Sequence, residues 1–203
     1  MPEVDVYTGL SPGAQFWFQA KRVREDGTPT QTEIGPSINF FIKQLKLQKL
    51  TVLDDSKKRF LVLSAGYRYL PVPGSPSQSR ILLMATPNLS IKGGVLVSDR
   101  NRLEINFING NAYWRYRNRL TLKKTIAVHS YHPSPYARAE FYDNSKFGKW
   151  SATAVKAGCI LPLGNRITLD PYYEHANATG VTPNQQTNAF GIVFSLSLRR
   201  FNQ

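Results

Sequence analysis

The stretch YWRYRNRL, residues 113 to 120, places Arg115, Arg117 and Arg119 at every second position. Guanidinium groups carry a permanent charge and a planar set of donors, so a row of them can bind phosphate or pair with carboxylates. A spacing of two is that of a β-strand, in which alternate side chains share one face. The three arginines therefore lie on one face of a strand, with Trp114 on the other.

Nucleic-acid binding is one chemistry that such a basic strand could perform. Proteins that bind single strands stack bases on aromatic rings that lie beside cations in one groove. Here the alternation turns Trp114 and Tyr116 away from Arg115 and Arg117, so that rings and cations cannot line the same groove. We expect no nucleic-acid partner.

Three histidines, His129, His132 and His175, are the candidates for a catalytic base. The first two lie in the proline-containing stretch VHSYHPSP, with a spacing that suits neither a helical metal pair nor a triad without further ligands. His175 follows Glu174 on a predicted strand, so the two side chains point to opposite faces. No glycine-rich phosphate loop is present. We therefore predict no enzyme, no catalytic residues, no metal site and no cofactor.

Length and composition limit the class of protein. A chain of 203 residues suits one domain, which we expect to span 1–203. The formal charge of +13 is typical of a nucleic-acid binder, an anionic-membrane binder or a pore with an anion-friendly lining. Cys159 is the single cysteine, so neither a disulfide nor a cysteine-based zinc site can form within the chain. No apolar run approaches the roughly 20 residues of a membrane helix, and no leader is visible at the start, so we expect the signal peptide to be absent or removed.

Apolar and polar residues alternate along most of the chain, as in SINFFIK, RLEINF and FGIVFSLSLRRF. Breakers such as EDGTPT, PVPGSPSQ, INGNA and LPLGNR separate about eleven such segments. Most segments have the roughly 9 to 11 residues of a membrane-spanning strand. We predict an all-β fold, an antiparallel up-and-down transmembrane β-barrel of about 10–12 strands. Because bacterial barrels normally have an even number, we expect a first strand missing upstream or one segment broken in two.

The orientation of the two faces separates a membrane barrel from a soluble one. A soluble barrel fills its interior with apolar side chains, whereas a membrane barrel turns them to lipid and keeps a polar lumen. The polar faces carry both signs of charge, as a lumen that pairs its own charges requires. We predict a lumen charge network of Arg102, Glu104, Arg115, Arg117, Arg119, Arg138, Glu140, Asp170 and Glu174. We predict lipid contact for Phe16, Phe18, Ile38, Phe40, Leu103, Ile105, Phe107, Trp114, Leu120, Phe190, Ile192, Phe194, Leu196 and Leu198.

Tryptophan and tyrosine lie mostly near strand ends, where an interfacial girdle would place them. The alternative is that these residues are simply good strand formers. The candidates for the girdle are Trp17, Trp114, Trp150, Tyr7, Tyr67, Tyr69, Tyr113, Tyr116, Tyr172 and Tyr173.

The stretches YWRYRNRLTLKK, VSDRNRLE, LPLGNRITLDPYYEHANATG and NQQTNAFGIVFSLSL together resemble one known family. It is the bacterial outer-membrane barrel family called domain of unknown function 2490, and the resemblance runs from about residue 60 to the end. The resemblance implies a signal-peptide-exported barrel in the outer membrane of a Gram-negative-type bacterium, and it supplies no catalytic or ligand residues. The ending RRFNQ departs from a terminal aromatic residue and leaves Phe201 as an imperfect insertion signal.

We expect an outer-membrane protein that is a small pore or a passive transport or envelope protein with a basic, arginine-lined lumen. Its partners would be outer-membrane lipids and lipopolysaccharide, with the barrel-assembly machinery during insertion; the sequence does not identify a solute. Because periplasmic turns are short, PLGNR would be periplasmic and NATGVTPNQQT extracellular, which places the C-terminus in the periplasm. Two alternatives stay open: a soluble lipocalin-like barrel that binds lipid or a small ligand, and an outer-membrane lipid-modifying enzyme.

Overall fold

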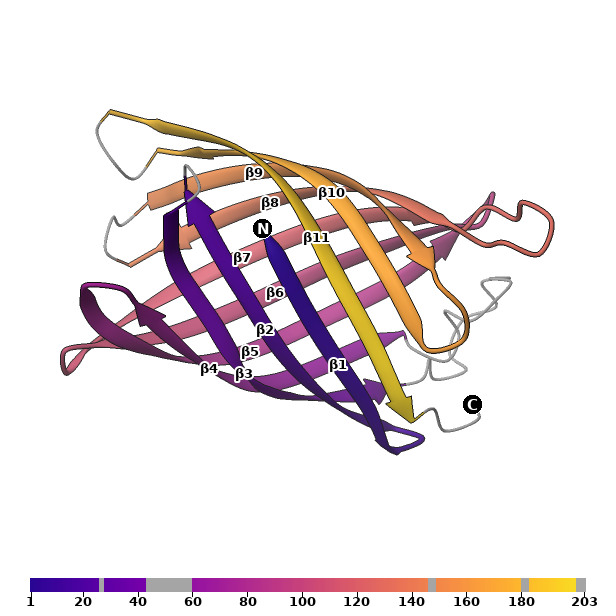
Figure 1. Ribbon diagram of the computed structural model, residues 1–203, viewed down its shortest axis with the longest axis horizontal. Coiled ribbons are helices and arrows are strands. Elements are labelled where there is room, and N and C mark those ends of the chain that lie inside the picture. Colours follow the sequence, from indigo (N-terminus) through magenta and orange to yellow (C-terminus); the bar gives the residue numbers. More distant parts are fainter. Residues whose placement is uncertain (26–27, 43–59, 146–148, 180–182, 200–203) are drawn as a thin grey trace.

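The computed structural model describes residues 1–25, 28–42, 60–145, 149–179 and 183–199, which form eleven strands and no helix. The strands are β1 (Pro2–Ser11), β2 (Ala14–Glu25), β3 (Thr28–Ile42), β4 (Leu61–Val72), β5 (Ser75–Ile91), β6 (Val95–Ile108), β7 (Asn111–Lys124), β8 (Ser134–Asn144), β9 (Lys149–Pro162), β10 (Ile167–Ala178) and β11 (Gln185–Arg199). Each pairs with the next along the chain, and β1 pairs with β11 to close the barrel (Figure 1). The predicted all-β barrel of about 10–12 strands is confirmed.

The closing pair differs from the others because it is parallel. Ten successive pairs are antiparallel, whereas Pro2 to Thr8 of β1 run alongside Ile192 to Arg199 of β11 in the same direction. When strands alternate in direction, an odd number forces the first and the last to run the same way. The structure therefore shows eleven strands where an even number was expected, and the prediction of a wholly antiparallel barrel is wrong at this one pair.

The connections fall at two rims. The strands β1, β3, β5, β7, β9 and β11 end at one rim, called the C-terminal rim, and β2, β4, β6, β8 and β10 end at the opposite rim (Figure 1). LSPGA and LPLGNR share the C-terminal rim, and the described ends of NATGVTPNQQT, at the end of β10 and the start of β11, lie at the opposite rim. The C-terminal rim also bears the longer connection 125–133, whereas two-residue turns at 73–74 and 109–110 lie opposite. Turn length alone therefore does not distinguish the rims as the sequence suggested.

Most predicted breakers are turns of the barrel, and one turn was missed. The stretch 85–101 contains a turn at 92–94 between β5 and β6, where Gly93 and Gly94 both have positive φ, of 90° and 73°. Two consecutive glycines in this backbone region are a hairpin signal that the sequence carried. Phe201, the expected insertion signal, lies outside the described residues.

Inward-facing glycines make room for tyrosine rings. Gly158 is opposite Tyr136, and a Cβ at Gly158 would lie only 2.6 Å from the Tyr136 hydroxyl. Gly191 is opposite Tyr172, and a Cβ there would lie 2.2 Å from its ring. Each ring therefore lies flat across a neighbouring strand, where it fills interior space that glycine leaves empty.

Candidate functional site: the charged interior

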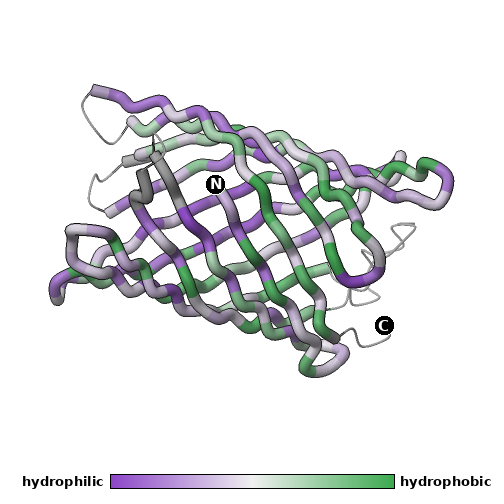
Figure 2. Tube along the Cα trace, in the orientation of Figure 1, coloured by the Kyte–Doolittle hydropathy of each residue, from purple (hydrophilic) through white to green (hydrophobic). Residues whose placement is uncertain are grey.

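The wall of this barrel is polar inside and apolar outside. A closed single-layer sheet can bury a side chain only in its interior, and the buried polar residues are Asp5, Gln19, Ser37, Arg68, Arg80, Arg102, Glu104, Asn106, Glu140, Ser151, Lys156 and Asp170. The exposed side chains at the alternate positions are large and apolar on almost every strand. Along the strands in Figure 2, hydrophilic and hydrophobic residues accordingly alternate.

Glu104 on β6 is the centre of the interior charges, with no accessible surface on its side chain. Its carboxylate lies 2.7 Å from Arg102 Nε, 2.5 Å from Arg115 Nη2 and 3.5 Å from Arg80 Nε. Arg117 lies at 4.0 Å. One fully buried carboxylate therefore serves four arginines from three neighbouring strands, β5, β6 and β7.

Two further carboxylates extend this network. Glu140 on β8 accepts hydrogen bonds from Arg117 Nε at 2.7 Å and from the Tyr142 hydroxyl at 2.5 Å, and it also pairs with Arg119. Glu33 on β3 pairs with Arg80 at 3.3 Å. We call the residues Glu33, Arg68, Arg80, Arg102, Glu104, Arg115, Arg117, Arg119 and Glu140 the central network.

Arg68 is the most enclosed cation of the central network, and it is fully buried. Its Nη1 donates to Ser37 Oγ at 2.9 Å and its Nε donates to Gln19 Oε1 at 3.2 Å. Its guanidinium carbon lies 4.9 Å from the centre of the Trp17 ring, and Glu33 is 3.7 Å away. Because these contacts come from β2 and β3, Arg68 extends the central network toward the first strands of the barrel.

Three of the nine predicted lumen residues do not join the central network, although all three lie in the interior. Asp170 accepts a hydrogen bond from the Tyr136 hydroxyl at 3.0 Å, and Glu174 pairs with Lys156 at 2.7 Å. Arg138 has no ion pair among the described residues, and its guanidinium stacks on the Tyr136 ring at 4.0 Å. The expectation that Asp170 would pair with the row of arginines is therefore wrong, because β10 lies two strands beyond the last strand that supplies a partner.

The sequence reasoning missed Glu33, Arg68, Arg80 and Lys156 inside the barrel. Arg68 has Tyr67 and Tyr69 on either side in the sequence, and Arg80 shares its face of β5 with the apolar Leu82 and Met84. Neither arginine therefore lies in a clear alternation of polar and apolar residues. The positions of Arg68 and Arg80 in the two-residue period of their strands nevertheless indicated which face each one occupies.

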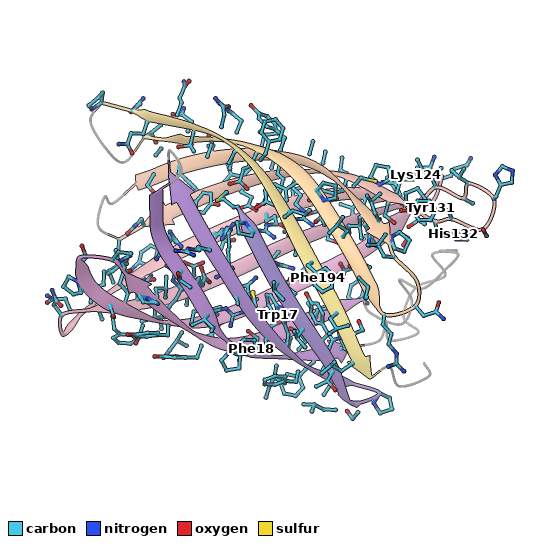
Figure 3. The ribbon with its side chains drawn as sticks, viewed as in Figure 1. Trp17, Phe18, Lys124, Tyr131, His132 and Phe194 are labelled. Atoms are coloured by element: carbon cyan, nitrogen blue, oxygen red, sulfur yellow. The ribbon has the colours of Figure 1, made fainter. Side chains whose placement is uncertain are left out.

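The residues predicted to contact lipid all lie at outward positions, with different degrees of exposure. Phe16, Phe18, Ile105 and Leu196 are partly exposed; the others, Ile38, Phe40, Leu103, Phe107, Trp114, Leu120, Phe190, Ile192, Phe194 and Leu198, are exposed. Phe18 and Trp17, neighbours on β2, are labelled in Figure 3.

The girdle prediction is wrong for four aromatic residues that face the interior. Trp17 and Tyr172 are buried in the interior, where Trp17 Nε1 donates to Asp5 Oδ1 at 2.9 Å. Tyr7 stacks on Trp17 and donates to Asp5, and Tyr113 is directly opposite the buried Asn106. Tyr69, Trp114 and Trp150 are exposed on the outside toward the opposite rim, and Tyr67 is exposed near the middle of β4.

The outer wall also carries a polar cluster that the sequence predictions did not include. Asn118 donates to Asp99 Oδ1 at 2.6 Å, and Tyr116, one of the girdle candidates, donates to Asn101. Beside these side chains the outer surface has a hollow of about 430 Å³. The outward-facing residues that line it are Phe40, Leu63, Ala65, Leu83, Ala85, Leu103 and Tyr116.

The histidines are far from the central network. His129 and His132 are exposed in the β7–β8 connection, which projects from the C-terminal rim next to Lys124 and Tyr131 (Figure 3). His175 is on the outside, where its Nδ1 lies 2.8 Å from Asn188 Oδ1, while Glu174 points inward. In the described ranges no three of the residues His, Cys, Asp and Glu are arranged to hold a metal ion. The same ranges contain no helix long and apolar enough to cross a membrane.

Comparisons with known proteins give no match. No family model, no curated protein and no solved structure is significantly similar to this chain.

Glu104→Gln tests the central network. The amide keeps the shape but leaves Arg80, Arg102 and Arg115 without their shared charge, and breaking a buried ion pair costs about 3–5 kcal/mol. We expect the free energy of unfolding in detergent, measured by urea titration of the tryptophan fluorescence, to fall by about that amount.

The matched control is Asp143→Asn, which removes a carboxylate from the outside of β8. It should change the free energy of unfolding by no more than about 0.5 kcal/mol. Equal effects of the two substitutions would contradict the central role of Glu104.

Proposed function

We propose that the protein is a β-barrel of the bacterial outer membrane. The observation that carries the proposal is the wall, which buries charged residues such as Glu104 and Arg68 and exposes large apolar ones such as Leu103 and Phe194. In water this arrangement would expose a continuous apolar surface, which soluble monomers rarely do. In a bilayer the same surface would be matched by lipid tails, and the closed sheet would satisfy the backbone groups.

A soluble lipocalin-like barrel has less support. Such a barrel binds its ligand in an apolar interior and presents polar residues to water. Here the interior contains the central network, and apolar Leu70, Leu82 and Met84 are minor parts of it. The resemblance to domain of unknown function 2490 implies the same location, but no family model matches the chain, so the proposal rests on the wall alone.

Within this proposal the barrel is a narrow, anion-favouring passage. Glu104, Glu140 and Arg68 expose almost no surface, so side chains of the central network fill the lumen where they meet. Arg115 and Arg119 remain partly accessible, with 27% and 15% of their side-chain surface exposed, so solvent reaches the cations on either side of that point. Rings of basic side chains favour anions over cations in pores. We expect low conductance, because the network must rearrange for an ion to pass.

Leu103→Arg tests the membrane location. An arginine on the lipid side of a barrel near the bilayer midplane costs about 2–4 kcal/mol, so the yield of folded barrel in lipid vesicles should fall. Folding is measured by the shift in gel mobility between unheated and heated samples. On a water-facing surface the same change would alter the free energy of unfolding by no more than about 0.5 kcal/mol.

His132→Arg is the control for Leu103→Arg, because His132 is exposed in a connection at the rim. It should fold in vesicles like the unaltered chain. Recovery of the unaltered protein as a detergent-free soluble monomer would refute the membrane proposal.

Conductance in a planar bilayer tests the passage. With a chloride gradient across the bilayer, the reversal potential should indicate anion preference, and Glu140→Gln should increase that preference because it removes an interior negative charge. Absence of ion flux, or preference for cations, would refute the passage and leave the membrane barrel intact.

We further propose that the C-terminal rim faces the periplasm. Turn lengths do not decide this orientation, because short turns occur at both rims and the longer connection 125–133 lies at the C-terminal one. A labelling experiment tests it directly. In a Cys159→Ser background, a membrane-impermeant maleimide should label Ser75→Cys, at the opposite rim, in intact cells. It should label His132→Cys only after lysis, and the reverse pattern would show the opposite orientation.

A further inference from the structure

Three arginines gather in the lumen on the side of the central network that leads to the C-terminal rim. Arg100 on β6 is directly opposite Arg119 on β7, and Arg138 lies on β8, the next strand. Arg119 and Arg138 are both close enough to Arg100 to repel it, and Arg119 also repels Arg138. Like charges directly opposite on paired strands are destabilising, so this arrangement needs a compensating interaction.

The carboxylates of the described residues compensate these three cations only in part. Glu140 pairs with Arg119, but it is shared with Arg117 and with the hydroxyl of Tyr142. Neither Arg100 nor Arg138 has an ion pair among the residues that the structure describes. The Nε of Arg138 is buried and has no hydrogen-bond partner.

Other charged groups near Arg138 are engaged elsewhere. Asp170 attracts Arg138, but it accepts the hydrogen bond of Tyr136 instead of pairing with the guanidinium. Lys156 is opposite Arg138 on β9 and pairs with Glu174. The excess of positive charge around Arg100, Arg119 and Arg138 is therefore not removed by the neighbouring strands.

The guanidinium of Arg138 is held in a fixed position. Its guanidinium lies 4.0 Å from the centre of the Tyr136 ring, and the hydroxyl of that ring is fixed by Asp170 at 3.0 Å. Gly158 leaves the space in which the ring lies. A donor that is already oriented loses less entropy when it binds. Arg100, Arg119 and Arg138 are also partly exposed, unlike Arg68 or Glu104, so a small solute can reach them.

We propose that Arg100, Arg119 and Arg138 bind a phosphate-type oxyanion in the lumen. The planar donors of guanidinium groups match tetrahedral oxyanions, and charge-assisted hydrogen bonds of this kind are the strong ones in proteins. The oxyanion would neutralise the three cations. The inference deepens the proposed function, and rests on it, because it names the class of solute that the passage would take.

Calorimetric titration of the purified full chain in detergent tests the site. Inorganic phosphate, glycerol phosphate and chloride are titrated at constant ionic strength, so that the general effect of salt is equal in all three. We expect phosphate to bind more tightly than chloride by at least about tenfold, which corresponds to about 1.4 kcal/mol. Binding of phosphate alone supports a site for the free anion, and binding of both phosphates supports a site for phosphate monoesters. Binding of neither above chloride would overturn the proposal.

Arg138→Gln and Arg100→Gln should each weaken phosphate binding by about tenfold or more. Arg138→Lys keeps the charge but not the planar donors, and it should give an intermediate loss, which provides a test if the glutamine variants fail to fold. Lys124→Gln, which removes an exposed charge near the same rim, should bind phosphate like the unaltered chain. Equal phosphate affinity in Arg138→Gln and Lys124→Gln would refute the site.

A second readout separates a binding site from a structural role. In the absence of phosphate, Arg100→Gln should raise the urea midpoint of unfolding, because it relieves the repulsion from Arg119. Phosphate should then stabilise the unaltered chain more than the variant. A lower midpoint without phosphate would show that Arg100 serves the fold and would overturn its role as a ligand of the anion. Chloride conductance and vesicle folding test the passage and the membrane location separately, so either can hold when the phosphate site fails.

Discussion

The burial of Glu104 among arginines from three strands is the interaction on which the interior depends. A carboxylate with no accessible surface is costly unless it is paired and hydrogen-bonded, and the same is true of the arginines around it. Arg80, Arg102 and Arg115 satisfy this requirement only because β5, β6 and β7 are in a register that brings them to one carboxylate. The charges therefore specify how these strands pair, in addition to lining the lumen.

A single-layer wall gives the two faces opposite environments. Once the central network occupies the interior, the residues that alternate with its members along each strand must point outward. Leu103, Trp114 and Leu120 therefore belong to the outer surface. This link explains why a polar lumen and an apolar exterior occur together in one sheet. The cluster around Asp99 and Asn118 is an exception on the outside, where the polar groups satisfy one another by hydrogen bonds.

Much of the candidate site could be predicted from alternation, and the errors have particular causes. Glu104, Glu140 and the arginines of β7 share one network because they belong to three consecutive strands, for which adjacency in sequence predicts adjacency in space. Glu33 and Arg68 contact residues of other strands across the interior, and no local pattern reveals such contacts. Trp17 was misplaced because its residue type favours an interface, whereas Asp5 provides a hydrogen-bond acceptor for it inside.

The sequence by itself determined the fold class, most of the turns and which residues share a face, because a period of two and glycine- or proline-rich breakers are local properties of the chain. Only the tertiary structure decided the parallel contact of β1 with β11, the pairing of Glu33 with arginines of β4 to β6, and the separation of Asp170 from them. These contacts depend on the number of strands in the barrel and on the stagger between them. Both are global quantities set by closure of the whole sheet.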